Sequence, residues 1–380
     1  MEFKFKEDEN GKIHDGDAIF ERLDEQLDNE EYDAVISRIL SIPKKKWSNK
    51  LRYKLICAYS DKRDFDSAEE ALDEYEPLCE SSADKARCRY MRGYVCFMTD
   101  KELMAREHYN AALKLDPDYA KSIDLEAEIA ECNNLIKNDL TALRAAFARA
   151  GKEIRERCAK NPKKRDITEE QFQMRLGFFP GIRRIPGFEH PIGFETYFRK
   201  YDGEEKESAL RWFRDFYGIT DTESFFNHVQ TDVGCNMTRM GMDVLAYLNG
   251  KPNFDVADLN ETGKFAFGSC VEFVRQFADV IPKAGVLAWD IGEKIGFARH
   301  AFYAGIIGNT DYCKGMITLG DAAIANFSSW EEYMRSLLCG AAMYAFNMGT
   351  WSISEAVTFT KNMLNFLVSS DLADVEWKLS

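Results

Sequence analysis

The sequence lacks the short motifs that identify most common enzymes. It has no GxGxxG or GxxxxGK[ST] phosphate loop, no HExxH zinc motif and no GxSxG nucleophile motif. None of its five histidines stands in a recognisable triad context with a serine and an acid. We therefore name no catalytic residue from the sequence, and whether the chain is an enzyme stays open.

Metal-binding and disulfide signals are also missing. The ten cysteines never form CxxC, and none has a histidine or a second cysteine at metal-ligand spacing. They are interpreted as buried thiols in a reducing compartment. No metal and no cofactor are expected.

Long apolar runs are absent, and the first residues are acidic where a signal peptide would be basic and then apolar. A cytoplasmic protein with no membrane partner is expected. Acidic residues outnumber basic ones by 64 to 50, giving a net charge of -14, which disfavours nucleic acid as a partner. A protein partner is favoured instead.

What the sequence does contain is a set of repeated amphipathic helical patterns over residues 17–159, after a segment (1–16) expected to be flexible. In one segment, small residues, an aromatic residue and a proline stand at a regular spacing: Ala86, Gly93, Ala105, Tyr109, Ala112 and Pro117. One repeat earlier, the corresponding places are held by Leu55, Tyr59, Phe65, Ala68 and Leu72, although Ile56 replaces the first small residue and Glu80 replaces the proline. The segment thus resembles tetratricopeptide repeats, which implies stacked helical hairpins. A helix over about 121–159 is expected to cap the stack.

Such an array has two open interpretations. It can offer a concave peptide-binding groove, or it can serve as a spacer or dimerisation surface. A groove for acidic peptide termini needs several free basic side chains, and only Arg87, Arg89 and Arg92 are candidates. Arg89 and Arg92 fall where core residues usually sit in the repeat.

Residues 160–203 change in composition, from basic to rich in proline, glycine and aromatic residues. A polar linker would not contain so many aromatic residues, so we expect an ordered strap packed against the second domain. Arg183 and Arg184 are candidate anion-binding residues, although exposed arginines are more often solvated or paired with nearby acids.

Residues 204–380 have a helical pattern throughout, so the predicted fold class is all-α: a tetratricopeptide-like hairpin array joined to a C-terminal helical domain. Helices are expected near 205–217, 222–249 (with a break at Gly234 or Gly241), 261–280, 285–307, 311–326, 329–347 and 353–369. Three helix starts fit the capping box: Ser328 with Glu331, Ser329 with Glu332, and Ser352 with Glu355.

The helix predicted over 285–307 places Arg299 in the middle of an apolar face. Because a lone buried charge is costly, a carboxylate or carbonyl groups must meet it. The candidate carboxylates are Asp243, Asp321, Glu331 and Glu332. A second stripe is interpreted as an exposed face with ordinary ion pairs, in preference to an acid-base site: Asp290, Glu293, Lys294, Phe297 and His300.

Two segments of this region, VLAWDIGEKIGFARHAFYAGII (286–307) and FSSWEEYMRSLLCGAAMY (327–344), resemble a bacterial family of unknown function, numbered 1266. The matching positions are Trp289, Asp290, Arg299, Gly305, Ser329, Trp330, Glu331 and Gly340. Glu293 and Ala341 stand where the resemblance implies two arginines, each after a glycine. The resemblance implies no activity, and the two departures favour a binding or structural member.

Two hypotheses about function follow. The leading one is a non-enzymatic protein-interaction protein, and an immunity or accessory protein of a bacterial toxin system is one role that the acidic charge suggests. The alternative is an enzyme or small-ligand sensor. Its pocket would be formed around Trp289, Asp290, Arg299 and Trp330, with His300, Ser329 and Glu331 nearby. It predicts that these side chains converge in one concave pocket.

Overall fold

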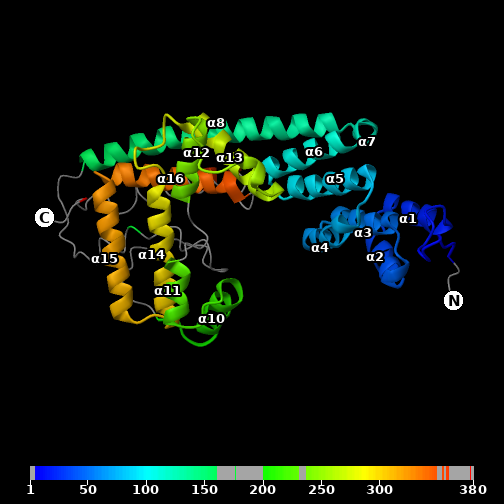
Figure 1. The fold of residues 1–380 in the computed structure, drawn as a ribbon, viewed down its shortest axis with the longest axis horizontal. Coiled ribbons are helices and arrows are strands. Elements are labelled where there is room, and N and C mark those ends of the chain that lie inside the picture. The colour runs from blue at the N-terminus through cyan, green and yellow to red at the C-terminus, as the bar shows by residue number, and fades with distance from the viewer. Residues whose placement is uncertain are drawn as a thin grey trace. The chain divides into compact units, whose positions relative to one another are not determined.

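The computed structural model describes residues 5–160, 176, 200–230, 237–348, 353–354, 357–358 and 377. Over these residues the regular structure is helical, apart from one β-bridge between Glu7 and Ile13 (Figure 1). The predicted all-α fold class is therefore confirmed. The chain divides into unit 1, Met1–Asn138, and unit 2, Asp139–Ser380, and each is described by itself.

Unit 1 is an array of helical hairpins, as predicted. The pairs are α1 (Ala18–Asp28) with α2 (Tyr32–Leu40), α3 (Asn49–Asp61) with α4 (Phe65–Tyr75), and α5 (Ser82–Met98) with α6 (Glu102–Leu115). The 3-10 helices η1 (Lys44–Lys46) and η2 (Glu76–Leu78) join successive hairpins. The third hairpin is followed by α7 (Pro117–Ser122) and α8 (Leu125–Lys160).

The helices α5 and α6 approach each other closely within their hairpin. A β-carbon at Gly93 would lie 2.4 Å from the ring of Tyr109, so only glycine fits under this ring. Ala105 and Ala112 on α6 are fully buried beside it. The small and aromatic residues that carried the repeat spacing thus lie where the two helices meet.

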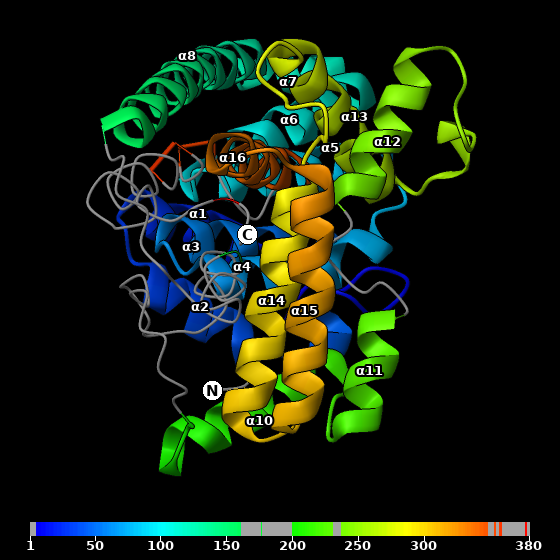
Figure 2. The same cartoon turned by 90° about the vertical axis from the view of Figure 1, so that its left-hand side faces the viewer.

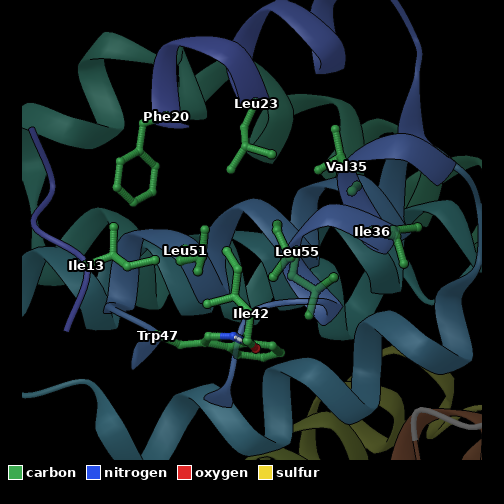
Figure 3. Packing of buried hydrophobic residues seen from close by; sticks show 11 residues of the cluster. Ile13, Phe20, Leu23, Val35, Ile36, Ile42, Trp47, Leu51 and Leu55 are labelled. Carbon is green, nitrogen blue, oxygen red and sulfur yellow. Dashed lines mark hydrogen bonds between the residues drawn. The ribbon is translucent and has the colours of Figure 1, made fainter. Parts of the chain in front are cut away.

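The first hairpins enclose a core that also holds the N-terminal segment. Residues 5–16, expected to be flexible, form a turn in which the Ile13 N–H donates to the Lys46 carbonyl (2.9 Å). Ile13 is fully buried and belongs to one cluster with side chains of α1, α2 and α3. Figure 3 shows these side chains: Phe20, Leu23, Val35, Ile36, Ile42, Trp47, Leu51 and Leu55. Burial of one isoleucine therefore anchors the segment.

The division between the units falls inside α8, whereas the sequence assigned the whole of this helix to the repeats. In its second half, α8 contacts the end of α13 (Glu261–Phe277) and the residues that follow it. Arg144 donates to both carboxylate oxygens of Asp279 (2.9 and 3.2 Å), and Phe147 packs edge-on against Phe277. These contacts explain why the second half of the helix belongs to unit 2.

Unit 2 is built around α14 (Leu287–Ala304). The helices packed against it include α10 (Gly203–Tyr217), α12 (Met237–Leu248), α15 (Asn309–Asn326) and α16 (Trp330–Met348). Figure 2 shows α14 and α15 side by side. The helix α11 (Thr222–Gln230) follows α10, and the 3-10 helix η4 (Val256–Asp258) precedes α13.

The observed helices agree with the predicted ranges except over 222–249. There α11 ends at Gln230 and α12 begins at Met237, so Gly241 lies within a helix and is not a break. Gly234 and most of 353–369 lie outside the described residues. Among the helices that the structure describes, none is both long and apolar enough to span a membrane.

Candidate functional site

Four of the predicted site residues, Trp289, Asp290, Arg299 and His300, lie on α14, which is almost entirely buried. Sixteen of its eighteen residues are buried, and Lys294 is exposed. Asp290, Glu293 and His300 are 5%, 4% and 3% exposed. The prediction of an exposed, ion-paired stripe is therefore wrong. A helical wheel assigns polar residues to solvent, whereas helices here cover both faces of α14.

Asp290 caps a neighbouring helix. Its two carboxylate oxygens accept the backbone N–H groups of Met237 (3.0 Å) and Thr238 (2.8 Å), the first residues of α12. A carboxylate at this place satisfies N–H groups that have no partner within the helix, and its charge suits the helix dipole. Burial nevertheless raises the pKa of Asp290 to about 6, against these hydrogen bonds, which lower it. Both oxygens are thus engaged in holding α12.

Trp289 lies in the contact between α14 and α16. It is fully buried, and a β-carbon at Gly340 would come within 2.2 Å of its Cβ. Its ring also packs on Tyr344, with centroids 5.6 Å apart. Next to it, the Ala288 N–H donates to the Ser336 hydroxyl (3.1 Å). Trp289 therefore packs α14 against α16.

Trp330 begins α16 and joins a cluster of aromatic rings. Its ring packs edge-on against Trp377 (4.9 Å) and Tyr333 (6.2 Å). The Tyr333 hydroxyl donates to the Leu176 carbonyl (2.7 Å), and the Trp377 indole N–H donates to the Phe327 carbonyl (2.7 Å). These bonds tie the start of α16 to distant parts of unit 2.

Arg299 and His300 lie further along α14. At about 1.5 Å per residue, some 14 Å of helix separates Asp290 from Arg299. Arg299 is 5% exposed, and the Nδ1 atom of His300 lies 2.7 Å from the Tyr201 hydroxyl. The structure therefore places the candidate residues in two groups along α14, one at Trp289 and Asp290 and one at Arg299 and His300.

The SSWEE segment forms a helix cap. The Ser329 hydroxyl accepts the Glu332 N–H (3.2 Å), and the Glu332 carboxylate accepts the N–H (2.8 Å) and hydroxyl (2.7 Å) of Ser328. The predicted cap by Ser329 is confirmed, although the carboxylate reaches the preceding residue. Glu331 instead pairs with Arg155 (2.7 Å). Asp243 accepts from the Asn253 side chain (2.7 Å), so three of the four carboxylates considered for Arg299 have other partners.

Several predicted residues lie outside the described part of the chain: Arg183, Arg184, Ser352 and Glu355. Within the described part, no group of three or more His, Cys, Asp and Glu side chains is arranged to hold a metal ion.

Unit 1 contains a groove of about 950 Å³ that no sequence motif marked. It is lined by the turn at 8–15, by the start of α3 (48–54), by the end of α4 with η2 (75–78) and by the start of α5 (80–87). Only the tertiary structure joins these four segments.

Asp84 fixes the floor of the groove. Its carboxylate accepts hydrogen bonds from four side chains: Ser81 Oγ (2.9 Å), Asn49 Nδ2 (3.1 Å), Tyr75 Oη (3.3 Å) and Arg87 Nη1 (3.4 Å). The first turns of α3 and α5 are thereby linked. Asp84 is thus part of the scaffold of the groove.

The rim of the groove offers both charged and apolar groups. Leu78 is 42% exposed and the neighbouring Pro77 is also exposed. The Lys50 ammonium donates to the Asp15 carbonyl (3.0 Å), and Lys12 is exposed. The lining holds four acidic and four basic side chains, apart from His14, and therefore has no excess of either sign.

Arg89 and Arg92 form ion pairs within unit 1 and do not make a basic surface for a peptide. Arg92 donates to Asp73 (2.7 Å) and Glu76 (3.0 Å), and Arg89 pairs with Glu76 (3.2 Å). Arg89 also lies 3.5 Å from His108 Nδ1. Burial, with a smaller contribution from the two arginines, lowers the pKa of His108 to about 4. Both arginines are therefore paired with acidic side chains of unit 1.

The comparisons with known proteins cover only the C-terminal part. Residues 212–369 match the model of a family described as "Protein of unknown function (DUF1266)". The match contains α14 and α16, so the resemblance stated from the AWD and SSWEE segments is confirmed. No curated protein and no solved structure matches the chain.

Proposed function

We propose that the chain is a non-enzymatic protein-interaction protein, in which the groove of unit 1 binds an extended segment of a partner protein. The groove carries this proposal. Its volume of about 950 Å³ lies at the upper end of the roughly 300–1,000 Å³ typical of ligand sites. Four separate segments of unit 1 contribute to its surface.

The chemistry of the lining supports a peptide over a small apolar ligand. An extended peptide presents backbone N–H and C=O groups along its length and needs polar partners for them. The side chains of Lys12, Lys50 and Arg87 can donate, and those of Asp15 and Glu80 can accept. Leu78 and Pro77 offer an apolar contact for one side chain of the peptide.

The geometry of α14 weighs against the alternative of an active site around Trp289, Asp290, Arg299 and Trp330. The carboxylate of Asp290 is engaged by the backbone of α12, and Arg299 lies about 14 Å further along the helix. In our proposal unit 2 contributes to partner recognition rather than to chemistry. The net charge of -14 favours a basic partner, which fits an immunity or accessory role towards a basic toxin.

Peptides selected from a random library on the purified chain test the proposal. Their affinity is then measured for the wild type, for Leu78→Glu at the groove rim and for Leu40→Glu. Leu40 is the matched control because it is 52% exposed in the same unit and does not line the groove. We expect Leu78→Glu to weaken binding at least tenfold and Leu40→Glu to leave it unchanged. Equal binding by both variants, or no selected peptide, contradicts the proposal.

A further inference from the structure

We propose that unit 2 holds a binding site for a small organic carboxylate with an apolar body about the size of a benzene ring. The site is a pocket of about 140 Å³ between the second half of α8, α16 and the segment that follows α13. It does not involve the groove of unit 1, and the inference does not depend on the proposed peptide binding.

The interior of the pocket is apolar. Phe147, Leu338 and Cys339 line it and are each at most 8% exposed. Burial raises the pKa of the Cys339 thiol to about 12, so the thiol is neutral near pH 7. Apolar cavities of about 150 Å³ are known to hold benzene. The interior thus suits an uncharged ring or a short branched chain.

Gly151 provides part of the space. It lies in α8 and lines the pocket, and a β-carbon built on it would stand 3.5 Å from Nη1 of Arg155. That is an ordinary contact distance, so a larger residue at position 151 would project towards the pocket without displacing backbone. This position therefore allows the pocket to be filled by substitution.

Two arginines give the pocket a positive side. Arg335 donates from Nη2 to the Val280 carbonyl (3.0 Å), which holds its guanidinium at the pocket and leaves further N–H groups for a ligand. Arg155 also lines the pocket and pairs with Glu331 (2.7 Å). A carboxylate accepts paired hydrogen bonds from a guanidinium, which is a favourable geometry for this anion.

The surrounding charges favour an anion as well. After the hydrogen bonds from Ser328, the charges of Arg335 and Lys283 contribute to lowering the pKa of Glu332, and Arg155 pairs with Glu331. Arg155 and Arg335 both line the pocket, whereas no acidic side chain among the described residues does. The Glu332 carboxylate is already held by the N–H and hydroxyl of Ser328, so it does not occupy Arg335.

The test uses the full chain and three probes: benzoate, its neutral analogue benzamide, and inorganic phosphate. Binding is followed by calorimetry and by ligand-observed NMR. We expect benzoate to bind with a dissociation constant of about 1 mM or tighter, which a ligand of this size can reach. Benzamide and phosphate are each expected to bind at least tenfold more weakly. Equal affinities for benzoate and benzamide, or no benzoate binding, would overturn the proposal. Equal affinities for phosphate and benzoate would show a general anion site and would also overturn it.

Three variants locate the binding. Arg335→Gln is expected to weaken benzoate binding at least tenfold, and Gly151→Val to abolish it by filling the pocket. Arg149→Gln is the control, because Arg149 lies on the same helix, pairs with Glu153 and does not line the pocket. Thermal melts show whether each variant is folded. If Arg335→Gln does not fold, the effect of Gly151→Val on benzoate binding decides the location of the site. Unchanged benzoate binding by a folded Gly151→Val overturns the assignment of the site.

Discussion

Gly340 of α16 lies directly against Trp289 of α14. A β-carbon at position 340 would stand 2.2 Å from Cβ and 2.8 Å from Cγ of the tryptophan, distances that real β-carbons do not adopt. Both residues belong to the segments that resemble the family of unknown function. Their contact accounts for this part of the pattern as packing between two helices rather than as part of an active site.

Gly340→Ala is therefore expected to destabilise unit 2. The added methyl meets the backbone end of a fully buried tryptophan, and overpacking of this kind costs about 3 kcal/mol or more. Denaturant unfolding followed by tryptophan fluorescence measures the loss, since five of the six tryptophans lie in unit 2. In the control Gly268→Ala the new β-carbon meets nothing within 4 Å, so this variant should gain up to about 1 kcal/mol. Equal stability of the two variants would contradict the packing account.

In unit 1, Gly93→Ala is expected to be destabilising through its contact with Tyr109. A β-carbon at position 93 would stand 2.4 Å from the ring, and the expected cost is about 1–3 kcal/mol. The double variant Gly93→Ala/Tyr109→Leu relieves the clash, so its loss should be smaller than the sum of the two single losses. Strict additivity in circular-dichroism melts would show that the two positions do not touch.

Asp290 should make unit 2 more stable as the pH falls from 7 towards 4. Its pKa in the folded chain is about 6, above the ordinary 3.8, so the folded state binds the proton more tightly. This contribution is present below about pH 4 and is lost as the pH rises through 6. Asp290→Asn removes the titration. The advantage of the wild type over this variant should be about 2 kcal/mol greater at pH 4.5 than at pH 7.5.

Unfolding free energies of both proteins at the two pH values measure this difference. Asp290→Asn also replaces one carboxylate oxygen by an NH2 group, which cannot accept from an N–H of α12, and this loss of one hydrogen bond costs about 1–3 kcal/mol even at neutral pH. A pH-independent difference between the two proteins would contradict the raised pKa, and no difference at any pH would contradict the cap.

His108 should have the opposite effect on unit 1. Its pKa of about 4 lies below the ordinary 6.5, so folding favours the neutral ring. The contribution is present above about pH 6.5, and up to about 3 kcal/mol is lost as the pH falls to 4. An NMR titration should give a midpoint near 4 in the wild type and a higher one in Arg89→Gln, which removes one repelling charge. A midpoint near 6.5 would contradict this environment.

The sequence predicted local features better than contacts between distant segments. The helix ranges, the cap at Ser329 and the close residues Gly93 and Tyr109 depend on neighbours three to twenty residues away, and these predictions agree with the structure. The prediction that the polar stripe on α14 is exposed was wrong, because a helical wheel describes one helix and not the helices that cover it.

The groove and the Asp290 cap depend on longer distances along the chain. The Asp290 carboxylate binds the start of a helix about fifty residues away, and the groove combines segments from residue 8 to residue 87. No spacing within either segment indicates the other. The division of α8 was missed for the same reason, since its contacts with Asp279 and Phe277 involve a helix far along the chain.

The most direct measurement for the proposed function is photo-crosslinking in the cells from which the chain comes. A photoreactive amino acid is placed at position 78, on the rim of the groove, or at position 40, outside it. The account predicts one partner protein crosslinked from position 78, not from position 40, and displaced by a peptide selected on the groove. The same crosslinks from both positions, or none from position 78, would contradict it.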